Sequence, residues 1–185
     1  MLASLAHIDR SLFLFLNGLH GEFFDPIMFW ASKTLIWFPL FVFLFYLVIR
    51  SFRWKTIIIV LSVAILVTVS DQLCNLSKNG FKRLRPSHES SLSSEIHTVN
   101  DYKGGAYGFY SAHASNTFAI AVFLLVLFRK KYRFLPFLMI CWALFFSYTR
   151  IYLGVHYPGD ILAGILIGSL LGYLCGKFIS YRLIK

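Results

Sequence analysis

Five long apolar runs separated by short polar segments form the main pattern of the chain. They cover roughly residues 27–49, 56–76, 113–128, 134–149 and 161–180. A helix needs about 20 apolar residues to cross the hydrocarbon core of a bilayer. The third and fourth runs are shorter than that and need flanking residues to span. The pattern therefore predicts a bundle of transmembrane helices.

The segment before the first run is amphipathic. Between Ile8 and Leu19 the polar side chains of Asp9, Arg10 and Asn17 lie beside an apolar set made of Leu12, Phe13, Phe15, Leu16 and Leu19. Such a segment can lie in the membrane interface or form a sixth, short membrane helix. We therefore expect an all-α fold, a polytopic transmembrane helix bundle of five to six spans. It forms a single domain over residues 1–185, with residues 1–26 as an interfacial N-terminal segment.

The composition is that of a membrane protein. Of the 185 residues, 58% are hydrophobic, 18% aromatic and only 14% charged. The mean hydropathy of +0.68 is too high for a soluble domain of this length. The net charge is +10, but the cations are clustered between apolar runs rather than spread over an amphipathic surface. A membrane explains that distribution better than a nucleic-acid partner, and we find no nucleic-acid-binding motif.

The loop charges predict the orientation of the bundle. Basic residues fill the segments 50–55 and 129–133 and the end of the chain from Lys177 onward. Under the positive-inside rule these segments are cytoplasmic. The N-terminal segment, the loop 77–112 and the turn 150–158 then lie outside. The loop 77–112 is more basic than an outside loop usually is, and binding of an anionic substrate explains the exception.

The first group of candidate functional residues follows the second run. Lys78, Arg85 and Pro86 form the pattern K-x6-R-P. A phosphoryl group in transfer spreads negative charge over its equatorial oxygens, which fixed cations stabilise, and arginine adds bidentate geometry. Pro86 restricts Arg85 to an extended conformation. An alternative is that these cations form an interfacial cluster that contacts lipid headgroups.

The second group lies immediately before the third run. Ser111 is a candidate N-cap, so the free backbone amides of Ala112 and His113 would point out of a helix N-terminus, the usual place for an anion. His113 can then give a proton to a leaving oxygen. The alternative is an ordinary helix cap followed by an interfacial side chain.

The third group lies before the fifth run. Arg150 is followed six residues later by His156 and four residues after that by Asp160, with Pro158 in the first turn of the expected helix. The carboxylate can accept the proton of one ring nitrogen, which leaves the other nitrogen with an exposed lone pair. His156 is therefore a candidate nucleophile. The alternative is a buried histidine–aspartate pair that holds the helix end.

Together the three groups resemble the signature of the membrane type 2 phosphatidic acid phosphatase superfamily. That signature reads K-x6-R-P, then P-S-G-H, then S-R-x5-H-x3-D, and the resemblance covers residues 78–160. It implies that the phosphate is bound by Lys78, Arg85, Ser111, Ala112 and Arg150. It also implies that His113 is the general acid and that His156, oriented by Asp160, forms a phosphohistidine that water then hydrolyses.

The chain departs from this signature at three positions. Tyr110 replaces the proline, Ala112 the glycine and Thr149 the serine. Thr149 keeps the hydroxyl and is expected to contact the phosphate-binding residues rather than the phosphate itself. Ala112 adds a Cβ, which fits only if the turn needs no positive φ. Because the catalytic side chains are all present, the departures concern fine specificity more than activity.

Other polar residues in these regions have structural interpretations. Asp71 precedes Lys78 by seven residues on the same helix face, so we expect it to support Lys78. His88 and His97 lie in a serine-rich loop and are expected to be solvated. The chain has no H-E-x-x-H motif and no carboxylate cluster in its sequence, so we expect neither a metal nor another cofactor.

Small residues recur every four positions along the fifth run. The stripe consists of Gly164, Gly168, Gly172 and Gly176. Such a stripe permits close contact between helices. Packing within the chain is favoured over a homodimer through this surface.

These observations predict an integral membrane enzyme, a metal-independent lipid phosphate phosphatase with residues 77–112 as its outer catalytic loop. We expect it in a bacterial cytoplasmic (inner) membrane, with the site facing the periplasm. Candidate substrates are a lipid A phosphate, undecaprenyl diphosphate, phosphatidylglycerol phosphate and phosphatidic acid. Two alternatives stay open. One is a non-enzymatic phospholipid-binding or transport protein with the same basic pocket. The other is a vanadium-dependent haloperoxidase, which shares this anion site but against which the membrane spans argue.

Overall fold

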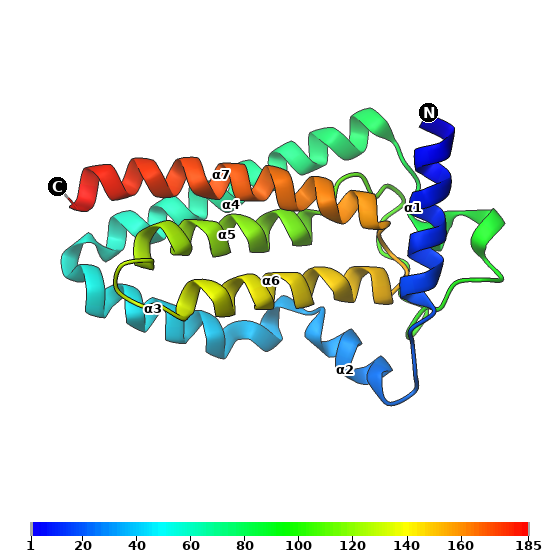
Figure 1. The fold of residues 1–185 in the computed structure, drawn as a ribbon, viewed down its shortest axis with the longest axis horizontal. Coiled ribbons are helices and arrows are strands. Elements are labelled where there is room, and N and C mark those ends of the chain that lie inside the picture. Colours follow the sequence, from blue (N-terminus) through cyan, green and yellow to red (C-terminus); the bar gives the residue numbers. More distant parts are fainter. Residues whose placement is uncertain (1, 185) are drawn as a thin grey trace.

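The chain folds into a bundle of α-helices, which confirms the all-α prediction (Figure 1). The structure, a computed structural model, describes residues 2–184. The α-helices are α1 (Leu2–Asn17), α2 (Phe24–Ala31), α3 (Phe38–Phe52), α4 (Thr56–Phe81), α5 (Ala112–Phe128), α6 (Leu135–Tyr152) and α7 (Pro158–Ile184). Short 3-10 helices cover Thr34–Trp37, Arg53–Lys55, Pro86–His88 and Ser90–Leu92.

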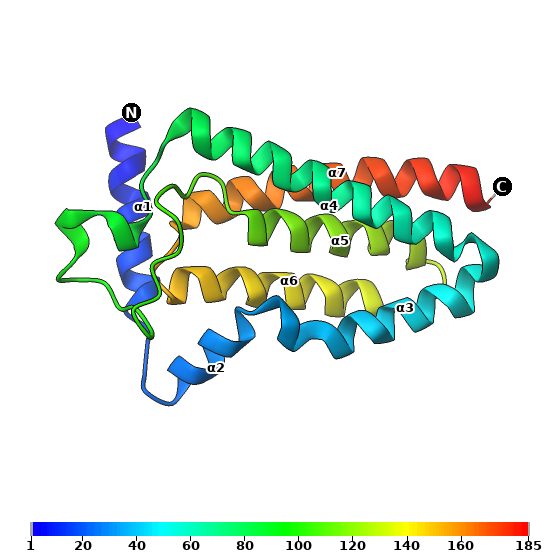
Figure 2. The same ribbon diagram turned by 180° about the vertical axis from the view of Figure 1, so that it is seen from behind.

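Helix α5 lies at the centre of the bundle, against α4, α6 and α7 (Figures 1 and 2). Its buried residues lie all round the helix rather than along one stripe, which is typical of a central helix. The glycine stripe of α7 faces α5. A Cβ on Gly168 would collide with the carbonyl of Ser115, and one on Gly172 with the carbonyl of Ala119. The stripe therefore serves packing within the chain, as the sequence analysis favours.

Three stretches of the described residues are long and apolar enough to cross a membrane: Thr34–Phe81, Leu135–Tyr152 and Pro158–Arg182. The first contains both α3 and α4, which run in opposite directions and are joined at Arg53–Lys55 (Figure 2). Helix α5 is apolar but shorter than these stretches. Large apolar side chains on the sides of the bundle are exposed, as they are in a protein that a bilayer surrounds.

The first predicted span, residues 27–49, is not one helix. The chain leaves the helical conformation at Lys33, which is extended, and α3 begins only at Phe38. Pro39 explains the restart. Proline has no backbone N–H to donate and is tolerated only in the first turn of a helix, which is where it lies in α3.

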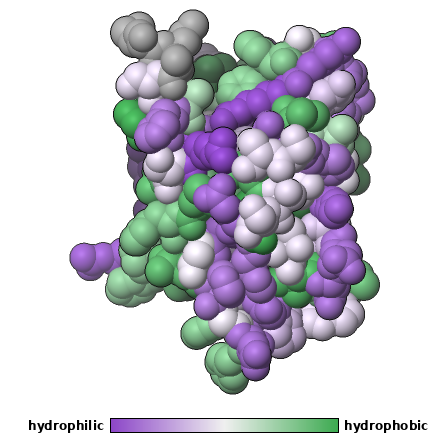
Figure 3. Space-filling model, turned by 90° about the vertical axis from the view of Figure 1, so that its right-hand side faces the viewer, coloured by the Kyte–Doolittle hydropathy of each residue, from purple (hydrophilic) through white to green (hydrophobic). Residues whose placement is uncertain are grey.

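Helix α1 lies across one end of the bundle rather than alongside its helices (Figure 1). The buried side chain of Asn17 holds it there, because its Nδ2 donates to the carbonyls of His97, Ile151 and Tyr152. Its Oδ1 accepts from the backbone N–H of His97 at 2.8 Å. Figure 3 looks onto this end and shows many hydrophilic residues across it. The interfacial position of α1 in a membrane stays a prediction.

Candidate active site

The three groups of polar residues meet at the end of the bundle that carries α1. Lys78 belongs to the last turn of α4 and Arg85 to the loop that follows. Arg150 lies in the last turn of α6, and His156 in the short connection between α6 and α7. The charges of all three cations reach His156 and lower its pKa. Residues far apart in the sequence therefore form one site.

His156 is buried, with 1% of its surface exposed. Its Nδ1 lies 3.4 Å from Oδ2 of Asp160. Gly108 packs so closely that a Cβ on it would lie 3.1 Å from the same carboxylate oxygen. Burial above all, and then the charges of Arg85 and Arg150, lower the pKa of His156 well below its ordinary value. The imidazole is therefore neutral at neutral pH, with a lone pair on one ring nitrogen.

Asp160 is oriented by groups other than His156. Its Oδ1 accepts a hydrogen bond from Nη1 of Arg83 at 2.8 Å, and its Oδ2 accepts one from the backbone N–H of Tyr157 at 3.0 Å. The contact of 3.4 Å with His156 is longer than a well-formed N–H···O hydrogen bond. The expected hydrogen bond is thus only a close electrostatic contact, because Arg83 and Tyr157 determine where the carboxylate points.

Arg83 joins Asp160 to helix α1. Its Nη2 lies 2.6 Å from Oδ2 of Asp9, and Oδ1 of Asp9 accepts from the backbone N–H of Gly159 at 2.7 Å. The guanidinium also lies over the ring of Tyr157, 4.2 Å from its centroid. Burial by itself would lower the pKa of Arg83, but the carboxylates of Asp160 and Asp9 outweigh it and raise that pKa above its ordinary value. The start of α7 is thereby held by α1.

Two arginines of the site are buried without a carboxylate partner. Arg85 is 8% exposed and Arg150 is 2% exposed. Arg150 donates from Nη2 to the hydroxyl of Tyr102 at 3.0 Å, and Arg85 donates from Nε to the carbonyl of Tyr107 at 3.1 Å. Neither forms an ion pair with an acidic residue in the described part of the chain. Burying like charges without a counter-charge is costly, so the pair is suited to an anion such as phosphate.

The loop before α5 shapes the surroundings of these arginines. Gly104 has a φ of +65°, and a Cβ there would lie 2.5 Å from Nη1 of Arg85, so a larger residue would be strained and would displace the guanidinium. Burial lowers the pKa of Arg85, and the charge of Arg150 lowers it further. For the hydroxyl of Tyr102, burial raises the pKa, but the charge of Arg150, its hydrogen bond and the charges of Arg85 and Lys33 together outweigh burial, so the net direction is downward.

The serine–histidine group begins helix α5. Ser111 is its N-cap, as predicted, and Oγ of this serine accepts from the backbone N–H of Ala114 at 3.4 Å. Ala112 is the first helical residue and has no positive φ, so the alanine is accommodated where the signature has glycine. The ring of His113 stacks on Phe146 with centroids 5.5 Å apart. It lines a cavity of about 320 Å³ between α3, α4, α5 and α6.

Comparison with known proteins identifies the family. The sequence profile of the PAP2 superfamily matches residues 56–184. The chain belongs to the PAP2 superfamily. It is 41% identical over 186 residues to the lipid A 4'-phosphatase of Bacteroides thetaiotaomicron, which covers 99% of this chain and 81% of that protein. It is 33% identical over 181 residues to the lipid A 4'-phosphatase of Porphyromonas gingivalis, which covers 96% of this chain and 75% of that protein.

The fold of this PAP2 protein also matches a solved structure. The PAP2-type phosphatidylglycerolphosphate phosphatase of Bacillus subtilis superposes with a TM-score of 0.73 over 96% of this chain and 87% of that chain, at 19% identity. The chain is therefore an integral membrane protein with the PAP2 fold. It is a lipid phosphate phosphatase of a metal-independent hydrolase family, which decides against the haloperoxidase and the non-enzymatic alternatives.

Two side chains expected to support the PAP2 site have other partners. Asp71 accepts a hydrogen bond from Nδ2 of Asn116 on α5 at 2.8 Å and forms no ion pair with Lys78 within residues 2–184. Seven residues of helix separate the two by about 10 Å along the axis, whereas α5 is adjacent. Thr149 is buried, and its hydroxyl donates to the carbonyl of Phe146 in its own helix at 2.6 Å. It therefore bonds its own backbone.

One loop histidine differs from the prediction. His97 is half-buried, its Nε2 lies 2.8 Å from Oδ1 of Asp25 in α2, and its ring stacks on His20 with centroids 3.8 Å apart. The serine-rich composition of the loop could not reveal these partners, because they come from the N-terminal segment. His88 is exposed, as expected for a solvated residue.

Sequence reasoning missed residues that position the PAP2 site rather than belong to its signature. They are Asp9, Arg83, Tyr102, Gly104 and Gly108. Arg83 lies inside the variable part of K-x6-R-P, where the pattern specifies nothing. An available signal was the acidic side chain of Asp9 in an amphipathic helix that also carries the polar side chains of Arg10 and Asn17, because a charge at the bundle surface favours a partner.

Proposed function

We propose that this phosphatase hydrolyses a phosphate monoester of lipid A through a phosphohistidine intermediate on His156. The observation that carries the proposal is a neutral, buried imidazole beside two buried guanidiniums, those of Arg85 and Arg150. The two positive charges can bind a phosphate dianion next to the imidazole, where its phosphorus is open to attack. The choice of lipid A follows the two relatives named as lipid A 4'-phosphatases.

The first step transfers the phosphoryl group to the protein. Nδ1 of His156 faces Asp160, so the tautomer with the proton on Nδ1 leaves the lone pair on Nε2. Nε2 attacks phosphorus, and an N–P bond forms while the bond from phosphorus to the sugar oxygen breaks. His113 gives its proton to the leaving oxygen. The cations around the site stabilise the charge on the equatorial oxygens.

The second step returns the enzyme to its starting state. Water attacks the phosphorus of the phosphohistidine while His113, now neutral, accepts one of its protons. The N–P bond breaks, its electron pair returns to His156, and inorganic phosphate leaves. The free amides at the start of α5, beside the cap formed by Ser111, bind the phosphate oxygens in both steps.

The surroundings of the site suit an amphiphile. The cavity beside His113 is lined mainly by apolar and aromatic side chains of α3 to α6, among them Phe41, Ile120 and Trp142. An acyl chain of a lipid can occupy such a cavity while its phosphorylated headgroup stays at the polar end of the bundle. A soluble phosphate ester has no apolar chain that would fill this cavity.

In the membrane, helices α3 to α7 make five alternating crossings in this proposal, with the site at the outer face of a bacterial cytoplasmic membrane. The segments at the other end, 50–55 and 129–133, carry basic residues and no acidic ones, as expected of cytoplasmic loops. Helix α1 then lies at headgroup depth. The catalytic loop 77–112 faces the periplasm.

The test is phosphate release by the full-length protein purified in a neutral detergent with chelator present. The panel is lipid A, undecaprenyl diphosphate, phosphatidylglycerol phosphate and phosphatidic acid, and lipid A should give the highest kcat/KM. His156→Asn should abolish release from every lipid and prevent trapping of an acid-labile phosphoenzyme. His88→Asn, at an exposed loop histidine, is the matched control and should keep full activity. Undiminished release by His156→Asn would refute the mechanism, and a clear preference for another lipid would refute the substrate.

A further inference from the structure

Lys33 is a cation next to the active site that the phosphatase signature does not include. It lies in the extended break between α2 and the 3-10 helix Thr34–Trp37, and it is half-buried. The next residue, Thr34, lines the cavity beside His113. Lys33 therefore lies at the edge of the candidate active site, although it belongs to none of the three groups of site residues.

Two aromatic rings position the ammonium of Lys33. Its Nζ lies 4.4 Å from the ring centroid of Phe29 and 4.9 Å from the ring centroid of Tyr102. The two rings are nearly perpendicular, at 85°, with centroids 6.4 Å apart, so they form a corner around the ammonium. A ring face attracts a cation but does not cancel its charge, as a carboxylate would. The corner therefore holds a flexible side chain in place and leaves its charge available.

Tyr102 connects this corner to the buried arginines. Its hydroxyl accepts the hydrogen bond from Arg150, and the guanidinium of Arg150 lies 5.4 Å from the centroid of the same ring. Burial raises the pKa of this hydroxyl, whereas the charges of Arg150, Arg85 and Lys33 lower it. The main charges that lower the pKa of His156 come from the three cations of the signature instead. Lys33 thus lies beside the cations around the nucleophile rather than among them.

No acidic side chain neutralises Lys33 among residues 2–184, where it forms no ion pair. The acid of the preceding helix, Asp25, is engaged by the side chains of His97 and Tyr152. A cation that is held by rings and has no carboxylate partner in this part of the chain can bind an anion of the substrate.

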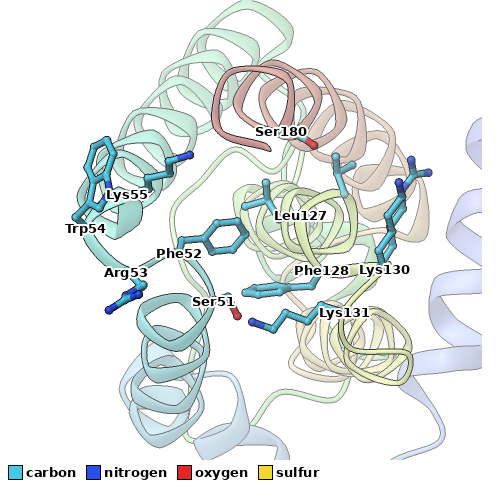
Figure 4. A pocket seen from close by; sticks show the side chains of 12 residues that line it. Ser51, Phe52, Arg53, Trp54, Lys55, Leu127, Phe128, Lys130, Lys131 and Ser180 are labelled. Carbon is cyan, nitrogen blue, oxygen red and sulfur yellow. The ribbon is translucent and has the colours of Figure 1, made fainter. Parts of the chain in front are cut away.

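The positive-inside rule does not explain a lysine at this end of the bundle. In the orientation proposed above, that rule accounts for the cations at the opposite end. Figure 4 shows the opposite end, where Arg53, Lys55, Lys130 and Lys131 lie around a pocket. Lys33 instead lies on the periplasmic side, next to the place where a phosphorylated headgroup would bind. This position favours a role in binding an anion over a role in topology.

We propose that Lys33 binds a second phosphate of the lipid A headgroup, in addition to the phosphate that is cleaved. The inference rests on the proposed function and names a specificity-determining residue for it. The buried arginines bind the phosphate beside His156, and the ammonium of Lys33 forms a charge-assisted hydrogen bond with the other phosphate of the same lipid. A lipid with two phosphates is then preferred over a lipid that carries only the phosphate to be cleaved.

The experiment compares two substrates in the assay of phosphate release described above. One is lipid A with both phosphates, and the other is lipid A that carries only the phosphate to be cleaved. Lys33→Met removes the charge but keeps an apolar side chain against the two rings. It should lower kcat/KM for the doubly phosphorylated lipid about fivefold, mainly through KM, and leave kcat/KM for the singly phosphorylated lipid nearly unchanged.

Three further variants test the charge and the aromatic corner. Lys33→Arg keeps the charge and should keep most of the preference. Phe29→Leu keeps the lysine but removes one wall of the corner, so it should lose part of the preference. The matched control is Lys103→Met, which removes an exposed lysine that follows Tyr102 in the same loop and should affect neither substrate. The thermal midpoint of each variant is measured alongside.

Three results would overturn the inference alone. An equal loss on both lipids in Lys33→Met would show that the lysine binds the cleaved phosphate or supports the fold. Unchanged kcat/KM on both lipids in that variant would show that it contacts neither phosphate. An equal loss in Lys103→Met would show that net charge at this end attracts the second phosphate. Release from neither lipid by the wild-type protein would refute the proposed function, and this inference with it.

Discussion

Replacing Arg83 by glutamine removes a cation that two carboxylates share. In the native protein its guanidinium lies 2.8 Å from Oδ1 of Asp160 and 2.6 Å from Oδ2 of Asp9. Asp160 is fully buried and the Asp9 side chain is 15% exposed. Glutamine can donate to one carboxylate but carries no charge. The buried carboxylate beside His156 would then lose its counter-ion and its orientation.

The magnitude follows from the burial of the three groups. Removing one partner of a fully buried ion pair costs about 3–5 kcal/mol. Arg83 is 31% exposed, and Asp160 keeps its bond from the backbone N–H of Tyr157 at 3.0 Å, so we discount that range to about 2 kcal/mol. The free energy of unfolding should fall by that amount, and kcat should fall as well, because Asp160 loses the cation that orients it beside His156. The KM should change little, because Arg83 points toward Asp160 and Asp9 rather than toward the buried arginines that would bind the phosphate.

The assay is steady-state phosphate release from the preferred lipid, with the thermal midpoint of each variant measured alongside. Arg83→Lys should recover part of kcat, because a lysine can pair with one of the carboxylates. Arg10→Gln is the control, since Arg10 is the cation next to Asp9 on α1 and its pair with Glu95 is exposed. A normal kcat in Arg83→Gln would refute the positioning role. A raised KM with normal kcat would show instead that Arg83 binds the phosphate.

Three further predictions concern the pH dependence of activity, the contact between α5 and α7, and the hydrogen bonds by which Asn17 holds α1. Because burial and cations lower the pKa of His156, the acidic limb of the kcat/KM profile should lie well below pH 6.5, and Arg150→Gln should move it upward. Gly168→Ala should destabilise the fold by about 1–3 kcal/mol through collision with α5, whereas Gly80→Ala, in open space, should not. Asn17→Ala removes the donor to the carbonyls of His97 and Tyr152, whereas the carbonyl of Ile151 keeps its bond from the backbone N–H of Gly154, and it should lower the free energy of unfolding by roughly 2 kcal/mol. Thermal and denaturant unfolding in detergent check the last two, and unchanged stability would contradict either one.

The groups around Lys78, Ser111 and His156 could be found from the sequence because charged residues next to membrane-spanning helices are rare and indicate a functional site. A polar side chain next to a long apolar run is costly unless it has a function or a partner. Alternating spans then place the ends of successive helices at two faces only, so residues far apart in sequence are assigned to one side. The cap at Ser111 follows from local chemistry in the same way.

Hydropathy alone could not find the helix boundaries. Residues 27–49 are apolar throughout, yet Lys33 is extended and Pro39 begins a new helix, because a missing backbone N–H acts on geometry rather than on polarity. At the end of α6 the hydropathy pattern stops too early rather than too late. Arg150 reads as the end of a span, but α6 continues to Tyr152, and Arg150 donates a half-buried hydrogen bond to the hydroxyl of Tyr102.

The contacts that orient Asp160 depend on where α1 lies, and no local pattern contains that information. Asp9 and Gly159 are 150 positions apart, and they meet because α1 lies against the end of the bundle, where Asn17 donates to carbonyls of α6 and Phe13 is buried. In this position of α1, Arg83 has a carboxylate on each side, and these two charges raise its pKa although burial lowers it. The prediction for Arg83→Gln therefore extends to Asn17→Ala. If α1 positions Asp160, unseating it should lower kcat as well as stability, whereas a loss of stability alone would limit α1 to a structural role.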